Sequence, residues 1–289
     1  MAQMGIFGLN IKAKVSNSWQ TLTPRVKAGG GWQSVRMAWV KVGGIWQPTY
    51  QYVWEYTFAS GEHTDVDLDN LSGIDKFHHV TITIPAGATL VASSTSAYAL
   101  KTGTGYGGTL KIINNGKILG RGGAGGTGGQ STSHFYVVNG SAGANGGPAI
   151  YIECPVTIDN NGLINGGAGG GAGGGGAADD RSWPSSNDYA SGGGGGGGAP
   201  YGAGGAAGSS HVNAGGAGST ASLTAPGNGG GGTTDGSATS GAGGAGGSWG
   251  QTGASGGSAS RGDYRKSGGA GGTAGPAYDN PDNFTVTQV

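Results

Sequence analysis

The sequence has few of the features on which disulfide-rich, membrane and nucleic-acid-binding proteins depend. A single cysteine, Cys154, occurs in 289 residues, so no intramolecular disulfide can form, and we expect it to be a small buried residue. Charged residues make up 10% of the chain and sum to zero at pH 7. That leaves no basic stripe for nucleic acid. No apolar run approaches the ~18 residues of a membrane span, and residues 1–12 lack a signal-peptide pattern.

Motifs for catalysis and metal binding are missing as well. Asp65, Asp67 and Asp69 alternate like the first ligands of a calcium loop. However, Asn70 stands where that loop needs glycine, and Lys76 stands where it needs a bidentate acid. We find no nucleophile with an adjacent base, no convincing carboxylate pair and no cofactor fingerprint. The sequence therefore predicts no enzyme, no catalytic residue, no metal site and no cofactor.

Glycine is the residue present in excess, with 56 of the 71 glycines between positions 120 and 275. They lack the Gly-X-Y period of collagen. Instead they form ten runs, at residues 120–129, 140–147, 166–176, 192–198, 202–208, 215–218, 227–232, 241–247, 253–257 and 268–275. A flexible linker is the simple alternative, but a linker has no use for ten similar runs separated by dissimilar segments. We predict a sandwich of about ten packed polyglycine-II-type helices, held by backbone hydrogen bonds.

If successive runs alternate in direction, the segments between them sort to two ends of the sandwich. One end receives residues 130–139, 177–191, 209–214, 233–240 and 258–267. These segments combine aromatic and arginine side chains with Ser, Asn and Gly, a composition suited to binding. The candidate receptor-binding residues are His134, Phe135, Tyr136, Arg181, Trp183, Tyr189, His211, Arg261, Tyr264 and Arg265. Trp249 falls at the opposite end.

Residues 1–57 are rich in tryptophan and contain a repeated pattern. Val26-Lys27-Ala28-Gly29-Gly30-Gly31-Trp32-Gln33 returns as Val40-Lys41-Val42-Gly43-Gly44-Ile45-Trp46-Gln47. Each copy predicts a β-hairpin, because a primed turn at Gly-Gly needs positive φ at both central residues. So small a module cannot enclose every tryptophan, so we predict a docking surface. Its candidate residues are Trp19, Trp32, Trp39, Trp46 and Trp54.

Residues 58–119 predict a β platform. Two Asn-Gly turns, at Asn115-Gly116 and at Asn161-Gly162, each lie between short apolar segments, which favours hairpins over residues 110–119 and 156–165. The second copy follows the first after 46 residues. The predicted fold class is thus mostly β and polyglycine-II. Its parts are a β module at 1–57, a platform at 58–119, a sandwich at 120–275 and a C-terminal tail or strand at 276–289.

The ten glycine runs with five segments at one end resemble the distal adhesins of T-even-type bacteriophage long tail fibres. The resemblance covers residues 120–275 and is one of pattern rather than of long identical motifs. It implies a virion protein at the fibre tip, attached to the trimeric fibre shaft through the N-terminal module. The receptor would be an outer-membrane protein of a Gram-negative host, recognised by the distal segments.

Two other functions compete with this interpretation. A structural or ice-binding polyglycine-II protein would need regular Thr or Ala positions and short uniform turns, whereas these segments are long and aromatic. A surface polysaccharide could replace the protein receptor, and a depolymerase would need paired carboxylates in a groove. Asp179, Asp180 and Asp188 share one segment, but acids adjacent in sequence are a weak catalytic signal.

Overall fold

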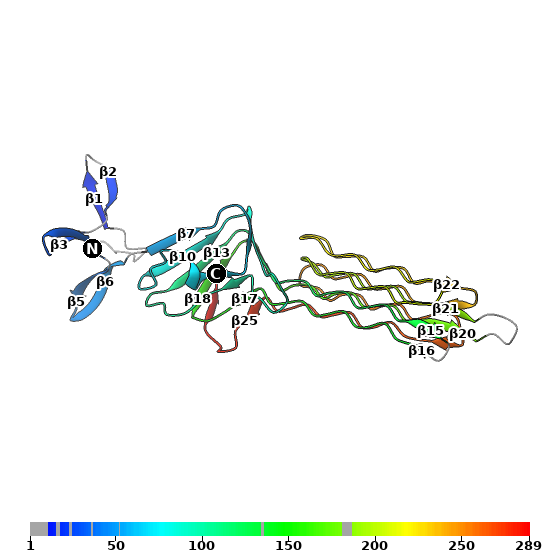
Figure 1. Ribbon diagram of the computed structural model, residues 1–289. Helices are drawn as coiled ribbons and strands as arrows, with labels where there is room; N and C mark the ends of the chain where they lie inside the picture. The colour runs from blue at the N-terminus through cyan, green and yellow to red at the C-terminus, as the bar shows by residue number, and fades with distance from the viewer. Residues whose placement is uncertain are drawn as a thin grey trace.

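The structure is a computed structural model that describes residues 11–289 except positions 16–17, 23–24, 36, 52, 134–135 and 181–186. The described residues form β-strands, long segments without strand pairing, and one 3-10 turn, η1 (Leu68–Asn70). Within these residues no helix has the length and apolar character needed to cross a membrane. Figure 1 shows N-terminal hairpins at one end, a strand-rich body in the middle and a bundle of extended segments reaching the other end.

The body is a parallel β-helix whose chain passes over three sheets in a fixed order. The first sheet contains β7 (Val53–Thr57), β10 (His79–Ile84), β13 (Leu110–Asn114), β18 (Val156–Asn160) and β26 (Val286–Gln288). The second contains β8 (Gly61–Thr64), β11 (Ala88–Val91), β14 (Lys117–Leu119) and β19 (Leu163–Asn165). The third contains β9 (Val66–Asp67), β12 (Leu100–Lys101), β17 (Ile150–Tyr151) and β25 (Tyr278–Asp279). Neighbouring strands are parallel in all three sheets.

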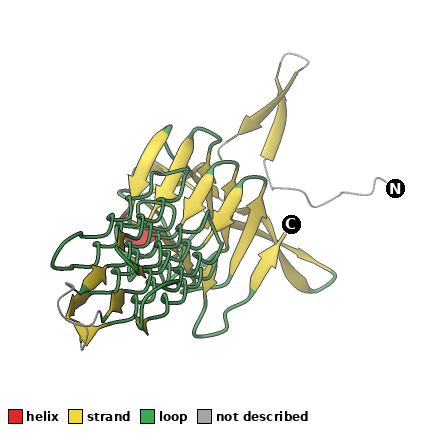
Figure 2. Cartoon of the chain, turned by 90° about the vertical axis from the view of Figure 1, so that its right-hand side faces the viewer, coloured by secondary structure: helices red, strands yellow, loops and turns green. Residues whose placement is uncertain are grey.

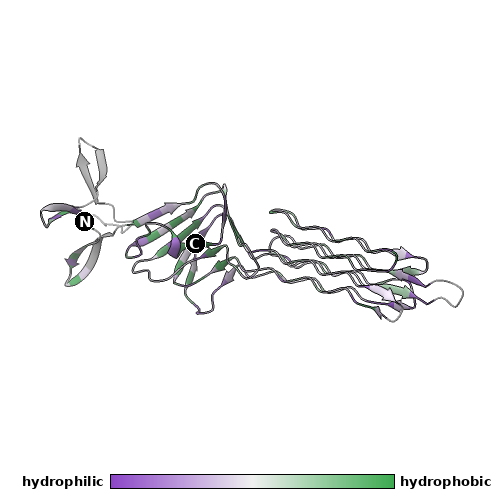
Figure 3. Ribbon diagram, in the orientation of Figure 1, coloured by the Kyte–Doolittle hydropathy of each residue, from purple (hydrophilic) through white to green (hydrophobic). Residues whose placement is uncertain are grey.

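Aliphatic side chains fill the β-helix and stack from coil to coil. Ile82, Ile112 and Ile158 lie in register on neighbouring strands and have no exposed surface. Along β10 buried and half-buried residues alternate, because successive side chains of a strand point to opposite faces. Figure 3 shows apolar residues concentrated on the strands of this body, whereas the bundle beyond it is close to neutral. The hydrophobic core therefore belongs to the β-helix.

The two predicted Asn-Gly hairpins are wrong. β13 and β14 lie in different sheets, and each pairs in parallel with the strand 46 residues later in the sequence, β18 or β19. A primed hairpin turn needs positive φ, and Gly116 is not among the glycines with positive φ. Glycine is needed there for space, because a Cβ at Gly116 would lie 2.3 Å from the Ala88 carbonyl oxygen. The 46-residue repeat is instead the register of stacked β-helix coils, with Leu110 opposite Val156.

The glycine-rich segments enter the β-helix as two insertions between its second and third sheets. The first lies between β14 and β17, and the second between β19 and β25. The ranges 1–57, 58–119, 120–275 and 276–289 consequently all contribute strands to one body. β7 comes from the first range, β17, β18 and β19 from the third, and β25 and β26 from the last. The bundle is thus tied to the β-helix by four chain crossings.

Backbone hydrogen bonds with a period of three residues join the glycine runs. In run 166–176, successive N–H groups donate to three different neighbouring runs in turn. The donor and acceptor pairs are Gly170 to Ala144, Gly171 to Gly196, Ala172 to Ala254, Gly173 to Ser141, Gly174 to Gly193 and Gly175 to Gly257. Three further runs donate back to its carbonyl groups, from Gly126, Gly244 and Gly272 among others. The run therefore has six hydrogen-bonded neighbours among the described residues.

Run 192–198 also exchanges backbone hydrogen bonds with six runs, one of which is 166–176. Both runs are buried along their whole length. The remaining eight runs form a closed ring of hydrogen-bonded neighbours around these two, in the order 120–129, 140–147, 268–275, 253–257, 241–247, 227–232, 215–218 and 202–208. The eight surrounding runs and the two central runs together make three layers, of three, four and three runs. Figure 2 shows this array from its far end, in front of the β-helix strands.

Three separate hairpins form the N-terminal part. They pair β1 (Ile11–Val15) with β2 (Ser18–Leu22), β3 (Arg25–Ala28) with β4 (Gly31–Ser34), and β5 (Met37–Val42) with β6 (Ile45–Gln51). The Gly-Gly hairpin turns predicted from the repeat are confirmed. Gly29 and Gly30 have φ of 58° and 84°, and Gly43 and Gly44 have φ of 59° and 87°.

Candidate functional site

The five segments assigned to one end of the bundle come together in the structure. They carry β15 (Ser131–Ser133), β16 (Tyr136–Val137), β20 (Ala177–Asp179), β21 (Asp188–Ala190), β22 (Thr234–Asp235), β23 (Ala238–Thr239) and β24 (Tyr264–Arg265). β20 pairs with β21 and β24, and isolated bridges join Ser131 to Ser210 and Thr239 to Arg261. The labelled distal strands lie together at the end farthest from the hairpins (Figure 1). We call this surface the distal face.

Small buried residues hold the base of the distal face. Ala177, Ala190 and Ala238 have no exposed surface and pack together. The Ser131 hydroxyl donates to the Ala177 carbonyl oxygen at 2.6 Å, and the Ser240 hydroxyl donates to the Ser191 carbonyl oxygen at 2.7 Å. Side chains this short leave little rotamer freedom. These contacts join segments 130–139, 177–191 and 233–240 at the base of the distal face.

Two aspartates tie segment 177–191 to segment 233–240. Asp188 is 6% exposed, and its carboxylate accepts a hydrogen bond from the Ser237 N–H at 2.6 Å. In return, the Asp235 carboxylate accepts from the Tyr189 N–H at 2.9 Å. Gly236, which lies between Asp235 and Ser237 in the sequence, has φ of 52°, and a Cβ there would collide with the Asp188 carboxylate. These carboxylates hold two loops together, which is a structural role that sequence reasoning did not assign.

Several predicted binding residues expose aromatic or cationic groups on the distal face. The exposed fractions are 53% for Tyr136 and 39% for Tyr264, and Arg261 and Arg265 are also exposed. Tyr189 is half-buried with its ring centroid 5.8 Å from that of the exposed His211. The other four predicted residues, His134, Phe135, Arg181 and Trp183, lie outside the described residues. Val212, beside His211, is 60% exposed, and no pattern in the sequence pointed to it.

The connections at the other end of the bundle face the β-helix. The Trp249 indole N–H donates to the Leu223 carbonyl oxygen at 2.7 Å, and the Lys117 ammonium lies 5.0 Å from its ring centroid. The Tyr201 hydroxyl donates to the Glu62 carboxylate at 2.6 Å. This hydrogen bond is the first cause of the raised pKa of Tyr201. These contacts brace the bundle against the body and leave the aromatic groups here in structural roles.

The predicted docking tryptophans divide into two environments. The exposed fractions are 68% for Trp32, 52% for Trp39 and 62% for Trp46, all on hairpins. Trp54 lies on β7, packs against the β-helix core and stacks on Tyr56 with ring centroids 5.9 Å apart. Trp54 thus packs on the first coil of the β-helix while remaining partly exposed, and its part in docking stays a prediction. The side chain of Trp19 lies outside the described ones, although its backbone is part of β2.

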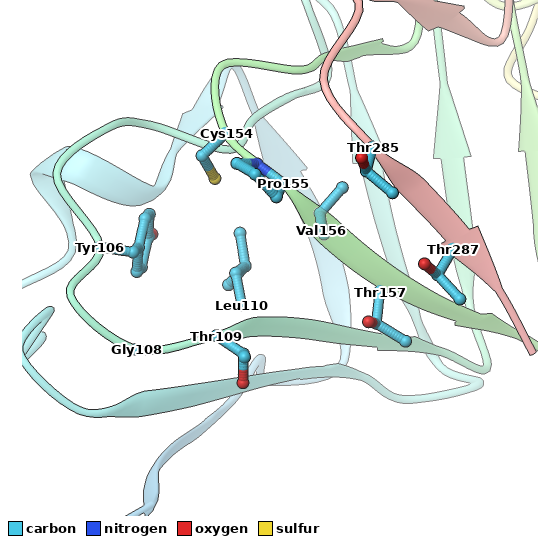
Figure 4. A pocket seen from close by; sticks show the side chains of 10 residues that line it. All are labelled: Tyr106, Gly108, Thr109, Leu110, Cys154, Pro155, Val156, Thr157, Thr285 and Thr287. Carbon is cyan, nitrogen blue, oxygen red and sulfur yellow. The ribbon is translucent and has the colours of Figure 1, made fainter.

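A cavity of about 210 Å³ opens on the β-helix, away from the distal face (Figure 4). Its lining includes Tyr106, Cys154 and the threonines Thr109, Thr157, Thr285 and Thr287. Burial raises the pKa of both the Cys154 thiol and the Tyr106 hydroxyl, so both stay protonated at neutral pH. A protonated thiol is a poor nucleophile. Within the described residues no three His, Cys, Asp or Glu side chains gather as metal ligands would.

Comparison with known proteins places this architecture in a family. The family model for phage tail fibre adhesin Gp38 matches residues 55–289, from the first β-helix strand to the C-terminus. The crystal structure of the gp37-gp38 adhesin tip complex of the bacteriophage S16 long tail fiber is similar at 23% identity and a TM-score of 0.46. The match covers 84% of this chain and 79% of that chain. A search of curated proteins gives no match. Because the family model spans most of its length, the chain belongs to the Gp38 phage tail fibre adhesins and is a virion component that serves host attachment.

Proposed function

We propose that this adhesin sits at the distal tip of the tail fibre and recognises an outer-membrane protein of a Gram-negative host through its distal face. The observation that carries the proposal is the convergence of five segments at one end, with Tyr136, Tyr264, Arg261 and Arg265 exposed there. Tyrosine and arginine are, with tryptophan, the residues enriched among those that dominate binding energy at protein interfaces. The short serine and alanine contacts beneath them keep the segments in place without receptor.

The scaffold beneath the distal face fits a polyglycine-II sandwich. Polyglycine II repeats every three residues, so its N–H groups point in three directions in turn, as the hydrogen bonds of run 166–176 do. At every glycine of run 166–176 an added Cβ would lie 2.6 Å or less from a backbone oxygen of a neighbouring segment, and only Ala168 and Ala172 of this run carry a Cβ. In this proposal glycine allows the close packing at those positions and so yields an arm that holds the distal face away from the fibre.

The N-terminal hairpins serve in this proposal as the attachment to the fibre shaft trimer. Trp32, Trp39 and Trp46 expose large apolar surfaces at the end opposite to the distal face. Exposed apolar groups of this size mark protein interaction sites. Trp19, at the equivalent position of the first hairpin, completes the proposed contact. One end of the chain would thus bind the virion and the other the host.

Competition for host cells tests the receptor assignment. The purified chain, added before phage, should block adsorption to the host, and whole outer membranes should retain it. Cells treated with protease should lose this binding if the receptor is a protein, while periodate oxidation of surface glycans should leave it intact. Loss after periodate alone would favour a polysaccharide receptor. Inhibition of ice recrystallisation without any binding to cells would favour the structural alternative.

A further inference from the structure

A second cavity, of about 390 Å³, lies on the outer side of the β-helix, over the third sheet. Its lining is chemically mixed and includes two carboxylates, an amide, a hydroxyl, an ammonium group and an aromatic ring. These groups belong to Asp65, Asp67, Asn70, Ser96, Tyr98 and Lys101. The volume falls within the range of small-ligand sites, roughly 300–1,000 Å³. All lining residues come from 65–101, so the cavity shares none with the distal face or the N-terminal hairpins.

The strand register of the third sheet sets a row of polar side chains beside this cavity. Across β9, β12, β17 and β25, the residues opposite one another are Asp67, Lys101, Tyr151 and Asp279. Leu100, next to Lys101 in β12, has no exposed surface. Because successive side chains of a strand point to opposite faces, the row points outward, with neighbouring members ~4.8 Å apart. The sheet therefore holds an acidic and a basic group side by side at the cavity.

Tyr98 lines the cavity with a ring that is held in place by two neighbours outside it. The ring centroids of Tyr98 and Tyr151 are 4.7 Å apart, with an angle of 29° between the ring planes. The Tyr98 hydroxyl donates to the Asp279 carboxylate at 2.6 Å. Desolvation by burial, and after it this hydrogen bond, raises the pKa of Tyr98 to about 12, so the hydroxyl stays protonated at neutral pH. The aromatic wall of the cavity is thus fixed without a ligand.

Backbone N–H groups position the two cavity carboxylates. Asp65 Oδ1 accepts from the Ser93 N–H at 2.8 Å, and Asp67 Oδ1 accepts from the Asp69 N–H at 2.9 Å. Within the described part of the chain, neither Oδ2 atom accepts a further hydrogen bond, and Lys101 forms no ion pair. Two oriented acceptors and one strong donor therefore remain for a bound molecule.

We propose that this cavity binds a neutral or amino hexopyranose of a bacterial surface polysaccharide. A pyranose carries several hydroxyl groups, each able to donate and accept, and an apolar face of C–H groups. Asp65 and Asp67 supply acceptors and Lys101 supplies a donor, while the Tyr98 ring offers the C–H face an apolar contact. Two carboxylates against one ammonium group give the lining a net negative charge at pH 7, which repels phosphorylated or acidic sugars.

The place of this site at the cell surface rests on the proposed function. Run 166–176 has eleven residues, which span about 34 Å in polyglycine II at ~3.1 Å per residue. With the distal face on an outer-membrane protein, the bundle holds the β-helix farther out by about this distance, within the saccharide layer that coats a Gram-negative cell. A sugar bound at the β-helix and a receptor bound at the distal face are linked contacts, so each raises the effective concentration for the other.

Saturation-transfer NMR of the full chain with polysaccharide released from host lipopolysaccharide tests the site. We expect transfer to the C–H protons of its hexose units. Lys101→Ala should weaken binding by on the order of tenfold, and Asn70→Ala by a smaller factor, because each removes a hydrogen bond to a sugar hydroxyl. Lys111→Ala is the matched control and should bind like the unmodified chain. Lys111 lies in the first sheet, outside the cavity, with its ammonium group 3.4 Å from the Asp159 carboxylate.

Three results would overturn the saccharide site. The first is no transfer to the polysaccharide, or equal binding by Lys101→Ala, Asn70→Ala and the unmodified chain. The second is loss of polysaccharide binding in Tyr264→Ala alone, which would move the sugar to the distal face. The third is calorimetric binding of calcium chloride together with no binding of polysaccharide, which would make the carboxylates a cation site. Recognition through the distal face fails separately, if Tyr136→Ala and Tyr264→Ala leave adsorption to host cells unchanged.

Discussion

The side-chain amide of Asn114 donates a hydrogen bond to the side-chain oxygen of Asn160, 46 residues later, at 2.7 Å. Asn114 also accepts from the Gly116 N–H at 3.1 Å and has no exposed surface. The pair joins the same corner of two successive β-helix coils, one strand before the chain leaves for each glycine-rich insertion. It therefore fixes the stacking of the coils that carry the bundle.

Asn114→Ala should lower the free energy of unfolding by about 1–3 kcal/mol, because it leaves the buried Gly116 N–H without its side-chain acceptor and removes the hydrogen bond to Asn160. Urea unfolding followed by circular dichroism measures this. Asn161→Ala is the matched control: Asn161 is exposed, and its backbone N–H still reaches the Asn114 carbonyl oxygen. Equal stability of the two variants would argue against a role for the asparagine pair in coil stacking.

Gly195→Ala should prevent correct folding of the bundle. A Cβ at Gly195 would stand 2.0 Å from the Gly171 carbonyl oxygen, so two packed backbones would have to separate. Gly231→Ala is its control, because among the described atoms none lies within 4 Å of a Cβ built there. Soluble yield and resistance to protease distinguish the two. A Gly195→Val protein that is soluble, protease-resistant and fully able to bind cells would rule out backbone-to-backbone packing at this run.

Stability should fall in mild acid through His79. Its pKa is lowered from 6.5 by desolvation and by the neighbouring His78, and its Nδ1 accepts from the Thr109 N–H at 3.1 Å. The folded state thus binds the proton less tightly than the unfolded state. The stability that neutral His79 contributes is present above the pKa of this histidine in the unfolded chain. It is lost as the pH falls through the lowered pKa of the folded state.

Urea midpoints at about pH 7.5 and pH 5 measure this dependence. In His79→Asn the side chain can still accept from Thr109 but does not titrate, so the midpoint should change less between the two pH values. The Asp75 carboxylate, 3.3 Å from the His78 Nε2, is present in both proteins. If the variant shows the same pH dependence, the loss of stability in mild acid comes from groups other than His79.

The sequence predicted those parts of the fold whose signals are local. Gly29-Gly30 and Gly43-Gly44 form the expected turns because only their own φ angles matter. The grouping of five connecting segments at one end of the bundle followed from the alternating direction of the ten glycine runs. The Asn115-Gly116 hairpin failed because the role of Gly116 depends on the Ala88 carbonyl, which lies in another coil. A β-helix interrupted by two insertions hides its coil period from the sequence, apart from the single 46-residue repeat.

The candidate site was predictable in place but not in detail. Aromatic residues such as Tyr136 and Tyr264 stood out by composition. The loop-to-loop bonds of Asp188 and Asp235 depend on segments 46 and 49 residues apart in sequence, so spacing could not reveal them. Trp54 shared its residue type with the hairpin tryptophans, yet its neighbour Tyr56 and the β7 register place it on the core. Tryptophan content alone cannot separate these two environments.

Adsorption to host cells by alanine variants at the two ends of the bundle tests the central claim most directly. Tyr136→Ala, Tyr264→Ala and Trp183→Ala should each weaken adsorption by on the order of 2 kcal/mol, or roughly thirtyfold, with nearly unchanged thermal transitions. Trp249→Ala, whose indole contacts Leu223 near the β-helix, should adsorb like the unmodified protein. Loss of adsorption in Trp249→Ala, with the three distal variants unaffected, would contradict recognition through the distal face.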